Sequence, residues 1–247
     1  MMMNDDKEYV VEGIVIKNIP YGENDGIITV LCADGLLTFK ARGILKPNGK
    51  NSASCLLYSE STFILNKSKS NNLTLIKGTQ DNSNFQLYDS IDVMCCLGLI
   101  SESILYFIDN TSSTIYSAFK TILQGVRNKF DIYTLTCIFL AKLINESGYG
   151  LQTSGCIRCG SNKKIVSLNF EDGGFICQKC LRINETIYNT DYLKTIRYIF
   201  IVNEDKYEHH IIEKSLATLI INQFFDYLQE QFGYKKLYFL DLFKEIN

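Results

Sequence analysis

The sequence feature that most constrains the fold is a cluster of four cysteines arranged as two Cys-x2-Cys pairs. The four residues are Cys156, Cys159, Cys177 and Cys180, with 17 residues between the pairs. All four thiols can meet only if the chain between the pairs reverses direction. That segment contains two short strand-like stretches, residues 164–170 and 174–177, joined by the turn EDGG. The spacing therefore predicts a finger at about residues 153–183, closed by a hairpin.

The chemistry of four thiols favours a structural metal site. Four thiolates complete the tetrahedral coordination of zinc and leave no position open for water or substrate, so we expect one structural Zn²⁺ ion per chain. Iron in a rubredoxin-like site and a metal-free or disulfide form are the alternatives. A thioredoxin-like redox role would need a Cys-x2-Cys pair at the start of a helix in a βαβ unit, and this context is absent here.

The other cysteines and the N-terminus indicate a cytoplasmic protein. Five cysteines are scattered, mostly in apolar segments, and we interpret them as small buried residues: Cys32, Cys55, Cys95, Cys96 and Cys137. An odd total of nine cysteines and an acidic N-terminus without an apolar segment argue against a secreted disulfide framework. No apolar run reaches the roughly 18 residues that a membrane span needs.

Residues 8–80 have the pattern of short strands joined by tight turns. Alternating apolar residues rich in β-branched side chains occur at 8–19, 26–32, 36–44, 61–67 and 72–78. Asp34 and Gly35 between the second and third runs are a strong hairpin signal. About five strands without a helix predict a small closed β-barrel over residues 1–80, and an OB-fold barrel has this size.

Residues 81–247 have helical periodicity instead. Apolar residues recur three and four positions apart at 89–109, 112–126, 131–148, 190–202 and 213–233. Asn189 is a candidate N-cap, and Gly148 a candidate C-cap. Helices this apolar must pack on one another. We therefore predict an α+β protein: an N-terminal five-stranded barrel followed by a helical bundle that carries the inserted finger.

Charge is unevenly distributed along the chain. The net charge is −2, yet residues 36–80 carry seven basic residues and one acidic residue, and residues 156–182 carry five basic and two acidic residues. Two basic islands on an otherwise acidic chain favour a localised face for a polyanion. Solvated lysine-rich loops are the alternative explanation.

The sequence contains no recognisable catalytic motif. His209 and His210 lie together in a charged stretch that is typical of an exposed loop. Phosphate-binding glycine loops and the nucleophile motif Gly-x-Ser-x-Gly are absent. We therefore expect a protein that is not an enzyme and has no small-molecule substrate.

The combination of a small barrel, a helical bundle and a four-cysteine finger within the bundle resembles the RecO family of bacterial recombination mediators. Residues 21–25 (YGEND) and 40–43 (KARG) stand where the family has similar motifs in its opening strands. The segments LINESGYGLQTSGCIRCGS and GGFICQKC are similar to the family's entry into the finger and to its closing knuckle. The resemblance covers most of the chain.

This resemblance implies an OB-fold that binds single- and double-stranded DNA and anneals complementary strands. It implies a part in DNA damage repair through the RecF pathway, at the nucleoid. Its expected partners are RecR and single-strand binding protein, and it would act indirectly on RecA by helping it load onto covered DNA. Some members lack the cysteines, which also favours a structural metal.

Candidate DNA contacts follow from the basic islands. On the barrel they are Lys40, Arg42, Lys46 and Lys50, with Lys17 as a weaker candidate. Phe39 is a candidate for stacking on a base, as OB-folds do; the alternative is that Phe39 and Phe63 point into the barrel core. In the finger the candidates are Lys163 and Lys164.

One property departs from the expectation for a DNA-annealing protein, because the isoelectric point is only about 5.8. Two other functions stay open on the sequence alone. One is an RNA-binding or regulatory zinc-ribbon protein, and the other is a scaffold that bridges proteins without binding nucleic acid.

Overall fold

The computed structural model describes residues 7–82, 90–108, 113–202, 206 and 210–247. The chain divides into two compact units, and each is considered by itself. The first is drawn from residues 1–89 and 110–123, and the second from residues 90–109 and 124–247. Residues 113–123, the first part of helix α2 (Ser113–Arg127), thus group with the barrel rather than with the other helices.

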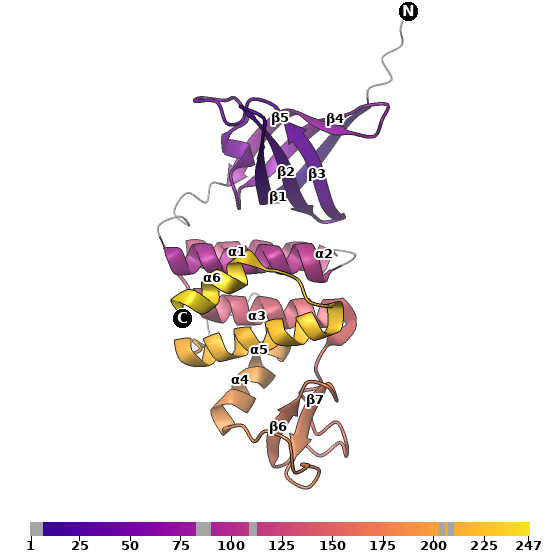
Figure 1. Ribbon diagram of the computed structural model, residues 1–247, viewed down its shortest axis with the longest axis vertical. Helices are drawn as coiled ribbons and strands as arrows, with labels where there is room; N and C mark the ends of the chain where they lie inside the picture. The colour runs from indigo at the N-terminus through magenta and orange to yellow at the C-terminus, as the bar shows by residue number, and fades with distance from the viewer. Residues whose placement is uncertain (1–6, 83–89, 109–112, 203–205, 207–209) are drawn as a thin grey trace, which may run out of the picture. The chain divides into compact units, whose positions relative to one another are not determined.

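Five strands close into a barrel in the first unit (Figure 1). They are β1 (Lys7–Tyr21), β2 (Asp25–Cys32), β3 (Gly35–Ala41), β4 (Glu60–Lys67) and β5 (Leu73–Asn82). The order around the barrel is β1-β2-β3-β5-β4, with β3 and β5 parallel and the other pairs antiparallel. The predicted five-stranded barrel of OB type is confirmed, including the hairpin between Cys32 and Gly35.

The inward-facing residues of the barrel are aliphatic and aromatic. Phe39 and Phe63 are at most 2 % exposed, and their ring centroids lie 5.1 Å apart. Outside this core, the Phe119 ring of α2 meets the Tyr58 ring edge-on at 6.3 Å. The amino group of Lys120 lies 3.7 Å from the buried carboxylate of Glu60. Apolar and charged contacts together therefore hold residues 113–123 against the barrel unit.

The second unit is built on helices α1 (Ile91–Phe107), α3 (Ile132–Ile144), α4 (Thr190–Ile201), α5 (Lys214–Phe232) and α6 (Tyr238–Ile246). Helix α3 contacts α1, α4 and α5, and nearly every residue of α3 is buried. Asn189 caps α4 as expected by accepting the Tyr192 backbone N–H at 2.8 Å. No helix among the described residues is long and apolar enough to cross a membrane.

Helix α6 was not expected from the sequence, and two residues of α1 hold it in place. A side chain at Gly98 would collide with Phe239, since a Cβ atom there would lie 2.3 Å from the ring. One turn later, the Glu102 carboxylate accepts the backbone N–H groups of Tyr238 at 2.9 Å and Phe239 at 3.0 Å. An acidic side chain thereby caps the positive end of α6.

The finger is inserted between α3 and α4. A π-helical turn (Asn145–Tyr149) ends the α3 segment, and Gly148 there has φ 87°, as expected at a helix end. The predicted hairpin follows as β6 (Ile165–Asn169) and β7 (Gly174–Cys177).

Candidate metal centre and nucleic-acid interface

The two Cys-x2-Cys pairs form tight turns that aim their sulfur atoms at one point. In the first turn the Gly160 N–H donates to the Cys156 carbonyl at 2.8 Å, and in the second the Cys180 N–H donates to the Cys177 carbonyl at 2.9 Å. Gly160 has φ 74°, the left-handed conformation expected directly after Cys159.

The four sulfur atoms fit a tetrahedral thiolate site. All lie within 4.8 Å of one another, and the Sγ atoms of Cys159 and Cys177 are 3.6 Å apart. Sulfur atoms at the corners of a tetrahedral zinc site are about 3.8 Å apart, because each Zn–S bond is about 2.3 Å long. The predicted cluster of Cys156, Cys159, Cys177 and Cys180 is therefore confirmed as a group able to hold one metal ion.

The electrostatics of the cluster also favour a bound cation. Burial opposes ionisation of Cys156, but hydrogen bonds from the backbone of Cys177, Arg158 and Cys159 prevail and lower the pKa of its thiol. Hydrogen bonds with Cys159, and then burial, raise the pKa of the Cys180 thiol. A bound divalent ion would offset the repulsion among the four thiolates and so allow all four thiols to ionise.

Arg158 joins the parts of the finger, so it does not contribute a free positive charge. It donates to the Cys180 carbonyl at 2.7 Å and forms ion pairs with Asp172 in the hairpin turn and Glu185 after the second knuckle. Arg158, followed by the Arg182 backbone N–H, lowers the pKa of Glu185 to about 2. Arg158 is one of the five basic residues of the finger segment, but its ion pairs give it a structural role.

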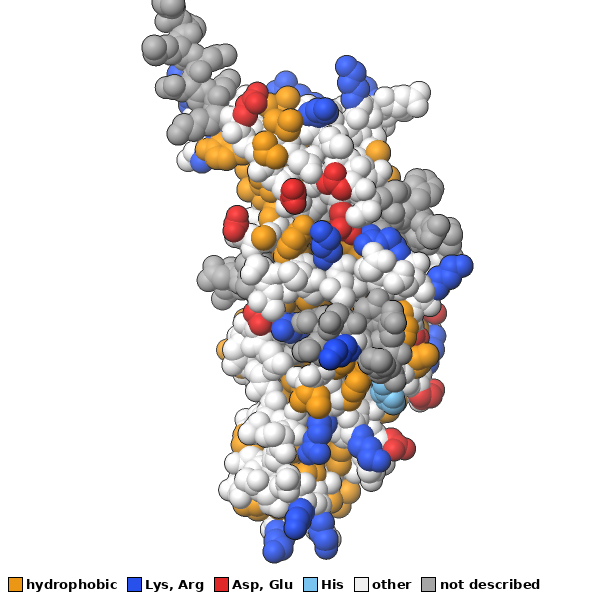
Figure 2. Space-filling model, turned by 180° about the vertical axis from the view of Figure 1, so that it is seen from behind, with side chains coloured by type: hydrophobic (Ala, Val, Ile, Leu, Met, Phe, Trp, Pro, Cys, Tyr) orange, Lys and Arg blue, Asp and Glu red, His pale blue; other side chains and the backbone are white. Residues whose placement is uncertain are grey.

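Lys163 and Lys164, the predicted finger contacts, are both exposed. Lys179 is exposed as well, and Lys and Arg side chains gather at the tip of the finger (Figure 2). These residues belong to the helical unit, whereas the other predicted contacts belong to the barrel unit.

The register of the barrel places two of the predicted phosphate contacts on one face. Lys17 of β1 is opposite Thr29 of β2, which is opposite Thr38 of β3. Two residues along, Ile27 is opposite Lys40. Paired residues in neighbouring strands share a face, and side chains alternate along each strand. Lys17 and Lys40 therefore point from the same outer face of β1, β2 and β3.

Lys40 borders a hollow of about 660 Å³ lined by residues 21–25 and by Lys40, Arg42, Gly43 and Lys46. Its amino group lies 2.9 Å from Oδ2 of Asp25 and 4.6 Å from the centre of the Tyr21 ring. The other oxygen of Asp25 accepts the Gly43 N–H at 2.9 Å. The hydrogen bond from Lys40, followed by that from Gly43, lowers the pKa of Asp25.

The loop after β3 is anchored at several points. The Leu45 N–H donates to the Asn24 carbonyl at 3.0 Å, and the Asn51 side chain accepts the Gly78 N–H at 3.0 Å. This loop carries two further predicted contacts, the exposed residues Lys46 and Lys50. The anchored backbone fixes where these flexible side chains begin.

The prediction that Phe39 stacks on a base is wrong. Phe39 is 2 % exposed and packs against Phe63, because odd-numbered residues of β3 point inward at this position. Tyr58, the other aromatic residue near these loops, is also buried, at 4 % exposed.

Two exposed aromatic residues of the barrel, Tyr21 and Tyr9, were not among the predicted contacts. They are 54 % and 38 % exposed, and each has a lysine near its ring: Lys40 for Tyr21, and Lys67 at 5.8 Å for Tyr9. The alternation of side chains along β1 could have predicted the position of Tyr21. Tyr21 is four residues from Lys17 and therefore lies on the same outward face of the strand.

His210 is exposed and its ring lies 5.1 Å from that of Tyr198, while His209 lies outside the described residues.

Comparison with known proteins shows which family this chain resembles. Residues 3–85 match the family described as "Recombination protein O N terminal", and residues 90–208 match "Recombination protein O C terminal". A DNA repair protein RecO from Caldicellulosiruptor bescii is 24 % identical over 247 residues, covering 96 % of this chain and 98 % of the relative. The protein of that name from Mesoplasma florum is 26 % identical over 196 residues, covering 77 % and 73 %. The one from Bacillus subtilis is 25 % identical over 173 residues, covering 68 % and 67 %.

Proposed function

Because this chain belongs to the recombination protein O family and so has a role in DNA repair and recombination, we propose that it is a non-enzymatic mediator that binds DNA and anneals complementary strands. It would bind both single- and double-stranded DNA. Its action would be to hold strands together in a pairing geometry, with no covalent step.

The observation that carries this proposal is the outer face of the barrel around Lys40. Lys17 and Lys40 share that face, and Arg42 follows Lys40 beside the exposed ring of Tyr21. A single strand over this face would meet cations at its phosphates and an aromatic ring at a base. Duplex DNA would use the same cations without the stacking, because its bases are already stacked with one another.

Lys46 and Lys50 extend the proposed contact surface along the anchored loop after β3. Lys163 and Lys164 of the finger are proposed as a second, weaker contact. The number of phosphates neutralised sets the salt dependence of binding, with a log–log slope of roughly 0.9 per contact on duplex DNA and roughly 0.7 on single strands.

For the metal centre we propose one zinc ion with a structural role. Cys156, Cys159, Cys177 and Cys180 would hold it, and its chemistry would be to neutralise and cross-link four thiolates. Arg158 would brace the same finger from outside the ligand set through Asp172 and Glu185.

The family implies the remaining elements of the proposal. The protein would act at the nucleoid together with RecR and would contact single-strand binding protein. It would help RecA load onto DNA that is covered by single-strand binding protein.

An annealing assay tests the proposal directly. Two complementary oligonucleotides, each covered by single-strand binding protein, are mixed with and without the protein, and duplex formation is followed by fluorescence quenching. We expect the protein to accelerate annealing and to bind both DNA forms in a salt-dependent way. A folded, metal-loaded protein that binds no DNA at low salt would overturn the proposal. Binding to RNA in preference to DNA, without annealing, would support an RNA-binding protein instead.

A further inference from the structure

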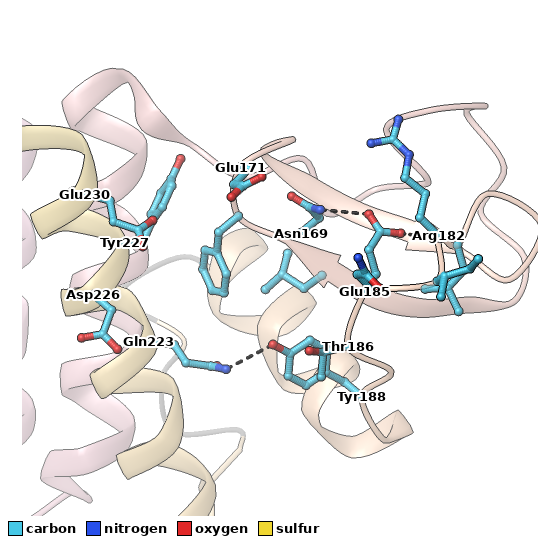
Figure 3. Close-up of a pocket in the computed structure, with 15 residues that line it drawn as sticks. Asn169, Glu171, Arg182, Glu185, Thr186, Tyr188, Gln223, Asp226, Tyr227 and Glu230 are labelled. Carbon is cyan, nitrogen blue, oxygen red and sulfur yellow. Dashed lines mark hydrogen bonds between the residues drawn. The ribbon is translucent and has the colours of Figure 1, made fainter.

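A groove of about 890 Å³ lies between the finger and helix α5 in the helical unit (Figure 3). Helix α5 contributes one side, with Asp226, Tyr227 and Glu230 facing the groove. The end of β6 and the segment after the second knuckle contribute the other side, with residues 168–171, 181–186 and 188. None of these residues belongs to the metal site or to the proposed DNA face.

The walls of the groove are fixed by hydrogen bonds and ring contacts. Gln223 on α5 donates to the Tyr188 hydroxyl at 3.2 Å and accepts from the Tyr192 hydroxyl at 2.6 Å. The Phe170 ring of the finger lies 5.2 Å from the Tyr227 ring of α5. These contacts connect both sides of the groove, so its shape exists before any partner arrives.

Apolar side chains contribute part of the lining of the groove. Leu168, Phe170, Leu181, Tyr188 and Tyr227 contribute apolar surface to the lining. Ile183 also lines the groove and is fully exposed, at 103 %. Ile183 is therefore free to contact a partner that enters the groove, next to the apolar side chains of the lining.

The charge of the groove is acidic. Glu185 is neutralised by Arg158, but Glu171 and Glu230 pair with no cation among the described residues. Asp226 has only Lys244, at 3.9 Å, and both side chains are largely exposed, so this pair compensates little of its charge. Within the part of the chain that the structure describes, Arg182 is the one basic residue that lines the groove.

This charge excludes one class of ligand and favours another. Carboxylates along one wall repel phosphates, so the groove is unsuited to DNA. Cationic side chains would be attracted to the same wall, and an apolar side chain between them could contact the apolar residues of the lining.

We propose that this groove docks a segment of a partner protein in which lysine or arginine side chains flank a large apolar side chain. The acidic groove would thus bind a basic protein segment, whereas the basic barrel face would bind DNA. The inference stands on the groove itself and does not depend on the annealing function.

The test is fluorescence polarisation with a labelled model peptide in which lysines alternate with leucine and phenylalanine. The test variant is Asp226→Lys with Glu230→Lys. The matched control is Asp241→Lys with Glu245→Lys, which makes the same charge change at the same spacing on exposed residues of α6, outside the groove lining. We expect the test variant to weaken binding about tenfold or more, and the control to change it less than about threefold.

Two further measurements keep the outcome decisive. Asp226→Asn with Glu230→Gln should weaken binding in the same direction if the lysine variant fails to fold. A peptide with serine in place of leucine and phenylalanine should bind the native chain at least about fivefold more weakly, since the apolar contact is lost. Equal losses in the test and control variants would mean that only net charge attracts the peptide, and would overturn the proposal. An unchanged affinity in the test variant, or equal binding of the serine peptide, would do the same.

Discussion

The amino group of Lys40 lies 2.9 Å from the carboxylate of Asp25, so the central cation of the proposed DNA face already has an anionic partner. The two side chains are only 34 % and 27 % exposed, and the Asp25 carboxylate also holds the Gly43 N–H of the next loop. A DNA phosphate bound at this proposed face would have to compete with Asp25 for Lys40. The ion pair would therefore weaken DNA binding, while it fixes the position of the lysine.

Replacing Asp25 with asparagine should strengthen DNA binding. Asparagine removes the competing charge but keeps an oxygen that can accept from Gly43. We expect the affinity for single-stranded DNA to rise about two- to fivefold, because an ion pair in contact with solvent contributes only a small interaction. Fluorescence anisotropy at fixed salt measures this. Asp34→Asn, in the turn at the opposite end of β2, is the matched control and should have less effect.

The gain in DNA affinity from Asp25→Asn should be independent of pH near neutrality. The hydrogen bond from Lys40, and then that from Gly43, lowers the pKa of Asp25. In the folded protein its carboxylate therefore stays ionised at pH values below the usual titration range of an aspartate. Stabilisation from the pair is present above the unfolded pKa and is lost only as pH falls through the lowered folded value. Between about pH 6 and pH 8 the affinity ratio of variant to native protein should thus be constant. A ratio that changes over this range would show that another group controls the site.

Reversing the charges of Lys40 and Arg42 should weaken DNA binding without unfolding the protein. Lys40→Glu with Arg42→Glu removes two phosphate contacts and adds repulsion, so we expect a loss of about tenfold or more and a salt slope lower by roughly one to two units. Lys235→Glu with Lys236→Glu, between α5 and α6, makes the same charge change in the helical unit and serves as the control. Unchanged affinity in a folded Lys40 and Arg42 variant would remove these residues from the site.

Tyr21 should contribute to single-strand binding more than to duplex binding. Stacking of a base on an aromatic side chain contributes ~1–3 kcal/mol to binding. Only the unpaired bases of a single strand are free to stack on Tyr21, because the bases of a duplex are stacked on one another. Tyr21→Leu should therefore lower the affinity for single strands more than about fivefold and leave duplex affinity nearly unchanged. Tyr21→Phe keeps the ring and should restore binding, whereas Tyr234→Leu on the helical unit should have no effect. Equal losses on both DNA forms would argue for a structural role of Tyr21.

Loss of one metal ligand should destabilise the finger far more than it weakens DNA binding. Native protein should contain one zinc ion per chain by elemental analysis, and Cys159→Ser should lower this content and the melting temperature together. Structural zinc contributes on the order of 10 kcal/mol of binding free energy in small zinc domains, so partial loss is readily detected. DNA affinity, measured on the folded fraction, should fall less than about threefold, since the proposed main contacts are on the barrel. The opposite order of effects would place DNA contacts in the finger.

Arg158→Met should make the finger release its metal more readily, although Arg158 is not a ligand. The change leaves the carboxylates of Asp172 and Glu185 close together without their shared cation, and removes a hydrogen bond to the Cys180 carbonyl. A lower chelator concentration should then be needed to extract the metal. Lys164→Met, an exposed residue of the same finger, is the control and should behave as the native protein does.

The local features of the fold could be predicted well from the sequence, because they depend on the spacing of residues within one segment. Four cysteines with a turn between them predicted the metal-binding cluster, and Asp34-Gly35 predicted the hairpin of β2 and β3. Helix α6 was missed because its position depends on the distant residues Gly98 and Glu102, whose contacts with it no local pattern reveals.

The five-stranded barrel, the helical bundle and the cluster of four thiols could be predicted from the sequence, since periodicity and motif spacing are properties of single chain segments. Which side chains act together depends on contacts between segments, and so it was visible only in the folded protein. Strand register put Lys17 and Lys40 on one face and turned Phe39 into the core, while the fold of the finger paired Arg158 with Asp172 and Glu185. These pairings join residues far apart in the chain, so they follow from packing and register, which exist only once the chain has folded.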